Sequence, residues 1–186
     1  RRYMMQKDEI VTAIELARKG INQYLAIMEM YPSVDVSTDK TFQRQFNAFY
    51  RIRQRSEKWY SEYYSFMENS KNSPVRFEAV LDHIYGVLGR YEPSFSSKLA
   101  ATLDPNEPVW DQYVLRNTGQ KAPYYTASNK FERAKTVFDN IRRWYIKHMQ
   151  SAEGVMMIEV FNNMVEKYDR ITNIKKVDFI LWKTRS

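Results

Sequence analysis

The sequence predicts an all-α protein, folded as a single globular domain of seven to eight helices over residues 1–186. Only 5 glycines and 6 prolines occur in the chain, too few for the many tight turns of a β-sandwich or barrel. Hydrophobic residues make up 44% of the chain and charged residues 27%, a balance typical of a folded domain. Apolar residues also recur at steps of three and four, first over 7–30, which is the spacing of an amphipathic helix.

Three more helices are expected in the first half of the chain. The second helix covers 41–69, with an interruption near Ser56. The third begins at Pro74, because proline lacks the N–H that would be unpaired at a helix start, and it stops before Gly89. A short helix over 94–103 follows directly on a proline.

Four helices are expected in the second half. A short one over 110–117 comes before Gly119, a common stop residue at helix ends. A longer basic helix runs from 130 to 147, and the next covers 153–170. A short apolar helix over 174–182 completes the predicted core.

The composition excludes several kinds of site. The chain has no cysteine, which removes disulfides, thiolate zinc sites, iron–sulfur clusters and cysteine nucleophiles. With only two histidines, we expect no metal centre and no cofactor. No apolar run approaches the roughly 18 residues of a membrane span and no secretory signal is present, so we expect a soluble cytoplasmic protein. The chain begins at Arg1 rather than methionine, and we expect residues to be missing before it.

The basic charge points to a polyanionic partner. The formal net charge is +7, which suits contact with nucleic acid, although a merely soluble basic protein would look the same. On the helix over 130–147, four cations are candidates for phosphate contacts: Lys130, Arg133, Arg142 and Arg143. The alternative is an ordinary solvent-exposed basic face. Arg51, Arg53 and Arg55 alternate by two, which on a helix would spread them over different faces.

The strongest functional signal lies between residues 91 and 117. Lys98 is expected in an early turn of a short helix, a proline turn follows, and Asp111 stands at the start of the next helix. This arrangement resembles the helix-hairpin-helix DNA glycosylases, in particular the branch with an 8-oxoguanine glycosylase-like fold. The resemblance implies that fold, DNA as the partner, Lys98 as the nucleophile and Asp111 as the assisting aspartate. The segment also departs from the family, because it lacks the glycine-rich hairpin that grips a phosphate.

The chemistry of such an enzyme sets requirements that the residues can be tested against. A lysine nucleophile must be neutral, so its pKa must fall from about 10.4 through burial or neighbouring cations. A nearby carboxylate would stabilise the cationic sugar transition state. The N-terminus of the helix that begins near Ser94 could hold a phosphate, with hydroxyl donors from Ser94, Ser96 and Ser97.

Other interpretations of the same residues remain open. Lys98 could be a solvated lysine or a structural partner of Asp104 or Asp111, and Asp111 could be a plain helix cap. The protein would then be a non-catalytic nucleic-acid-binding module, or a helical interaction protein without a nucleic-acid role. We expect a monomer in each case. What decides between these interpretations is whether the Lys98 amine and the Asp111 carboxylate open onto one basic cleft.

Overall fold

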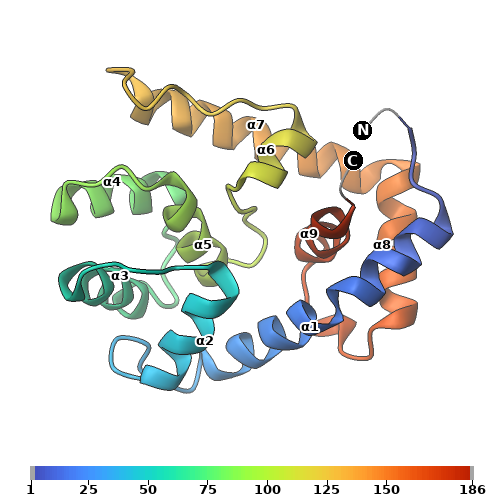
Figure 1. Cartoon of the computed structure of the whole chain (residues 1–186), viewed down its shortest axis with the longest axis horizontal. Helices are drawn as coiled ribbons and strands as arrows, with labels where there is room; N and C mark the ends of the chain where they lie inside the picture. Colours follow the sequence, from blue (N-terminus) through green and yellow to red (C-terminus); the bar gives the residue numbers. More distant parts are fainter. Residues whose placement is uncertain (1–2, 185–186) are drawn as a thin grey trace.

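The computed structural model describes residues 3–184 and is built from helices, which account for 69% of the protein (Figure 1). Within these residues there are nine α-helices, one 3₁₀-helix and no strand. The elements are α1 (Lys7–Met30), α2 (Lys40–Tyr50), α3 (Glu57–Asn69), α4 (Phe77–Leu88), α5 (Pro93–Leu103), α6 (Gln112–Thr118), α7 (Lys130–Gln150), α8 (Ala152–Met164), η1 (Tyr168–Arg170) and α9 (Asn173–Lys183). The predicted all-α class is confirmed.

The expected helix over 41–69 is in fact two helices, α2 and α3. Arg51 ends α2 in the left-handed conformation with φ of 57°, and Gln54 has φ of 55°. Residues other than glycine rarely have a positive φ, and an α-helix needs a negative φ at every residue. The helix therefore ends at this segment. The Ser56 side chain then accepts a hydrogen bond from the N–H of Trp59 and begins α3. Residues 51–56 therefore form a loop, which we call the arginine loop, and the earlier view of its arginines as helical residues is wrong.

Two other boundaries differ from the sequence-based expectation. The third predicted helix begins only at Phe77, because Arg76 is still extended. The helix expected over 153–170 ends at Met164, where Val165 turns to an extended conformation, and Tyr168 is exposed rather than buried. By contrast, Gly89 follows its helix in the left-handed conformation, as a glycine stop predicts.

Helix α9 occupies the middle of the fold. It packs against α1, α6, α7 and α8, and in Figure 1 it lies enclosed between them. Helices α3, α4 and α5 pack against one another to one side, and α2 joins them to α1. One buried hydrophobic cluster runs through both groups of helices. The segments that carry Lys98 and Asp111, α5 and the start of α6, lie where the two groups meet.

None of the helices in the described part of the chain is both long and apolar enough to cross a membrane.

Candidate functional site

Lys98 lies in the second turn of α5 with a half-buried side chain. Its Nζ donates a hydrogen bond to the backbone oxygen of Tyr50, at 3.2 Å, and stands 5.0 Å from the centre of the Phe95 ring. Burial lowers the pKa of the amine to about 8. The charges of Lys175 and Arg51 also lower this pKa, and Asp111 opposes them. The amine is therefore about one-tenth neutral at pH 7 and half neutral near pH 8, far more than an ordinary lysine.

Asp111 is the N-cap of α6. Its Oδ1 accepts a hydrogen bond from the N–H of Val114 at 2.8 Å. Burial raises the pKa of its carboxyl, although that hydrogen bond and the charge of Lys98 act in the opposite direction. The structure thus gives Asp111 the structural role of a cap and also places its charge within reach of Lys98. Within the described residues the two side chains share no ion pair: the Lys98 amine binds the Tyr50 backbone oxygen, the Asp111 carboxylate caps α6, and the two groups are linked by an electrostatic interaction alone.

Helix α9 adds a second amine and a second acid, which the sequence analysis did not identify as site residues. Lys175 and Asp178 are both completely buried, with an exposed fraction of 0%. The Tyr145 hydroxyl donates a hydrogen bond to Asp178 Oδ1. Burial raises the pKa of Asp178 to about 7, against the opposing effects of Lys175 and of the hydrogen bond from Tyr145. Asp178 is thus only partly ionised near neutral pH.

These groups form one charged cluster, which we call the central cluster. Electrostatic interactions link Lys98 to Asp111 and Lys175, and they link Asp178 to both Lys175 and Asp111. The cluster draws on the end of α2, on α5, on the start of α6, on α7 and on α9. Its members are Tyr50, Lys98, Asp111, Tyr145, Lys175 and Asp178. A sequence signal for the α9 members existed: Lys175 and Asp178 lie three residues apart in a segment that is otherwise apolar from Ile174 to Trp182 except for Lys176.

The serines at the start of α5 do not form the phosphate site that the sequence analysis expected. Ser96 and Ser97 are fully buried. The Ser97 hydroxyl donates to the backbone oxygen of Ser94 at 2.7 Å and accepts from the N–H of Trp110 at 2.7 Å. It therefore holds α5 against the segment before α6. Only Ser94 is partly exposed.

The basic residues of α7 are not one phosphate-binding stripe either. Arg142 is held by two carboxylates, those of Glu78 and Glu107, and ties α7 to α4 and to the segment before α6. Arg143 is 77% exposed and pairs with Asp139 at 3.0 Å. Lys130 lies over the ring of Tyr125, at 3.9 Å, and Arg133 is exposed. Arg142 is thus a structural residue, whereas Arg133 and Arg143 are exposed and Lys130 is half-buried.

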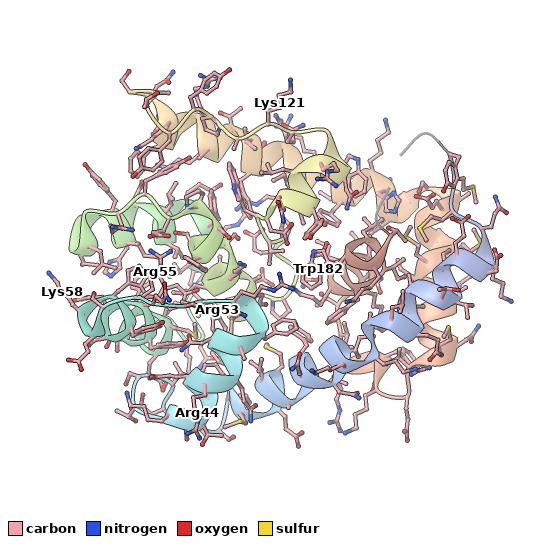
Figure 2. The ribbon with its side chains drawn as sticks, in the orientation of Figure 1. Arg44, Arg53, Arg55, Lys58, Lys121 and Trp182 are labelled. Carbon is pink, nitrogen blue, oxygen red and sulfur yellow. The ribbon has the colours of Figure 1, made fainter. Side chains whose placement is uncertain are left out.

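Exposed cations on α2, the arginine loop and α3, which we call the basic surface, are a second candidate for contact with a polyanion, and in Figure 2 Arg44, Arg53 and Lys58 lie well apart from one another. Together with Arg51 they are exposed, and none of the four forms an ion pair within residues 3–184. Arg55, by contrast, pairs with Glu92 at 3.3 Å. The loop begins directly after Tyr50, whose backbone oxygen binds Lys98, so this basic surface adjoins the central cluster.

The described residues hold no group of three or more His, Asp or Glu side chains suited to a metal ion. No protein-family model, curated protein or solved structure matches this chain.

Proposed function

We propose that the protein is a DNA glycosylase with AP lyase activity, in which Lys98 is the nucleophile and Asp111 the electrostatic partner. The observation that carries the proposal is a half-buried amine with a pKa of about 8 that interacts electrostatically with the carboxylate of Asp111 and forms no ion pair with it. This is the state that an amine nucleophile needs near neutral pH. The proposed fold is that of the helix-hairpin-helix glycosylases, supported by the close packing of α4 on α5 and by Asp111 at the N-cap of α6.

The proposed reaction uses both groups. The neutral Lys98 amine attacks the sugar carbon that carries the damaged base, the glycosidic bond breaks, and the base leaves with the bonding electrons and takes up a proton. The attacking nitrogen loses one proton, the ring oxygen leaves C1′ and takes up a proton, and an iminium that keeps one N–H is formed. For the lyase step, a proton leaves C2′ and the 3′-phosphate departs with the C3′–O bonding electrons, and water then hydrolyses the iminium and frees the Lys98 amine. The Asp111 carboxylate stabilises the positive charge that develops on the sugar. An amine in a direct ion pair would stay protonated and could not begin this sequence.

The basic surface supports a nucleic acid as the substrate. Arg51 and Arg53 are exposed, carry no ion-pair partner in the described residues and stand in the loop that begins beside Lys98. Phosphates bound by this loop would place the adjoining nucleotide next to the amine. Binding through such cations releases counterions, so affinity should fall steeply with salt concentration.

Borohydride trapping tests the nucleophile directly. The protein is incubated with duplex and single-stranded oligonucleotides that contain an abasic site or one of a panel of damaged bases, and borohydride reduces the iminium to a stable amine. We expect a covalent adduct that mass spectrometry places on Lys98 and that Lys98→Gln abolishes. Lys19→Gln, an exposed lysine on α1, serves as the matched control and should leave the adduct intact. Absence of an adduct across the panel would rule out the enzymatic proposal.

Asp111→Asn separates the two roles of this residue. The asparagine side chain can still accept from the N–H of Val114, so the cap is kept and only the charge is lost. We expect stability to change by less than about 1 kcal/mol, while base release slows by about 10²-fold or more. A variant that excises bases at the native rate would show that Asp111 is a cap and nothing more.

Non-catalytic nucleic-acid binding is the second candidate, and the unpaired cations of the basic surface favour it specifically. In that case the protein would bind DNA with a steep salt dependence but give no adduct. Lys98→Gln would leave the affinity nearly unchanged, whereas Arg53→Ser would weaken it and reduce the salt slope by about 1. Fluorescence anisotropy with labelled oligonucleotides at several salt concentrations measures both quantities.

A further inference from the structure

The least expected group in the protein is the amine of Lys175. It is fully buried, and its Nζ has no hydrogen-bond partner among residues 3–184. Nearly all buried polar groups in proteins are hydrogen-bonded, because an unpaired one in the interior loses free energy. A methionine would fill the same space without that loss. The presence of a lysine at this position is therefore not explained by packing.

Three aromatic rings surround the Lys175 amine. Its Nζ stands 5.3 Å from the ring centre of Tyr24, 5.8 Å from that of Tyr50 and 5.4 Å from that of Trp182. The negative faces of aromatic rings attract a cation, so they hold the charge in place without accepting its protons. Asp178, one turn along α9, compensates the charge only in part because its own carboxyl is partly protonated near neutral pH.

The ring of Tyr50 connects Lys175 to Lys98. The Lys98 amine also stands 5.8 Å from the centre of this ring, so two amines from different helices lie over one aromatic side chain. A positive charge on Lys175 repels a proton on the Lys98 amine and so lowers the pKa of Lys98. Of the two, Lys98 is the half-buried one that adjoins the basic surface, so Lys98 is the amine that can meet a substrate.

We propose that Lys175 is a positioning residue for the Lys98 amine: a buried amine without a hydrogen-bond partner in the described residues, held among three aromatic rings, one of which, Tyr50, it shares with Lys98. A catalytic role of Lys175 rests on the proposed function, but the effect of its charge on the pKa of Lys98 does not. The other charged groups whose electrostatic effect reaches Lys98 are Asp111 and Arg51, and the amine lies over the ring of Tyr50. Burial is the largest influence on the Lys98 amine, Asp111 favours its charged form, and Arg51 and Lys175 both favour its neutral form.

The protonation of the Lys98 amine can be measured without any substrate. Trace acetylation of the folded protein over a pH series, followed by mass spectrometry of the Lys98 peptide, gives the pH at which this amine becomes reactive. In the native protein we expect half-maximal reactivity near pH 8. Lys175→Met removes the charge and keeps the length of the side chain. It should move the titration to higher pH and slow the labelling of Lys98 near neutral pH by about threefold or more.

Lys176→Met is the matched control. Lys176 is the next residue of α9 and is also buried, but its Nζ binds the side chain of Asn173 at 3.2 Å and lies over the ring of Tyr168. This variant has the same net charge as Lys175→Met and should leave the Lys98 titration unchanged. An equal shift in both variants, or none in Lys175→Met, would overturn the proposal.

Two further variants separate charge from packing. Lys175→Gln should reproduce the shift of Lys175→Met, while Lys175→Arg should keep the native titration. If Lys175→Met does not fold by circular dichroism, this pair decides the question, and an equal shift in both would show that packing, not charge, controls Lys98. If Lys175→Met shifts the Lys98 titration but the native protein gives no borohydride adduct, this inference holds and the proposed enzyme is rejected. If the native protein gives an adduct but Lys175→Met leaves the titration unchanged, the proposed enzyme holds and this inference is rejected.

Discussion

Replacing Lys98 with methionine should stabilise the protein at neutral pH, although it removes a hydrogen bond. The pKa of this amine is about 8 in the folded protein against an ordinary value of 10.5. The difference corresponds to an upper limit of about 3 kcal/mol for holding the charge in the fold. Solvent screening at a half-buried site reduces this value, and the lost bond to the Tyr50 oxygen costs about 1 kcal/mol. The net expected gain in the free energy of unfolding is about 1 kcal/mol.

The stabilisation by Lys98→Met should depend on pH. Below pH 8 Lys98 is protonated in both the folded and the unfolded protein, so the free energy of burying its charge destabilises the fold in full. Between pH 8 and the ordinary lysine value, the unfolded chain binds a proton that the folded protein does not, so native stability rises with pH. The methionine variant lacks this contribution, and its advantage should therefore shrink as the pH rises.

Urea unfolding followed by circular dichroism at about pH 7 and about pH 9.5 measures both effects. Lys19→Met, on the exposed face of α1, is the control and should differ little from the native protein at either pH. A Lys98→Met variant that is less stable than the native protein by the same amount at both pH values would refute the reasoning. Such a result would mean that the amine is an ordinary structural residue.

Two further predictions concern stability away from the cluster. A Cβ at Gly154 would lie 1.9 Å from the backbone oxygen of His148, so Gly154→Ala should lose about 3 kcal/mol or more, a fall of roughly 6–12 °C in Tm. Gly86→Ala, where a Cβ meets nothing within 4 Å, should instead gain about 0.5–1 kcal/mol. Arg142→Met leaves two carboxylates without their buried partner and should cost about 3 kcal/mol. Arg143→Met, at an exposed position, should change stability by less than about 0.5 kcal/mol, as calorimetry can show.

The elements that the sequence predicted best are those whose signals are local. The bounds of α1 agree with the expected helix over 7–30, because its apolar stripe is unbroken over the whole helix. Asp111 was expected at a helix start, and its cap hydrogen bond is formed. The break after α2 was located too late, because Arg51 adopts a left-handed conformation that its residue type does not indicate.

The site residues that the sequence missed depend on tertiary packing. A lysine and an aspartate in a short apolar helix can face solvent or the interior, and local spacing does not distinguish the two. Lys175 and Asp178 became site residues only because α9 packs against four other helices in the middle of the fold. The serines of α5 show the converse error: their helix was predicted correctly, but Ser96 and Ser97 face inward.

The central position of α9 also bears on how the protein is made. During synthesis, α5 and α6 emerge from the ribosome before α9, the segment that carries Lys175. The earlier helices therefore cannot complete their core until α9 has been made. Contacts between residues so distant along the chain form late in folding. A nascent chain would therefore hold Lys98 without its neighbouring charge, and a reactive amine would arise only once translation had passed residue 183 and the helices had closed around α9.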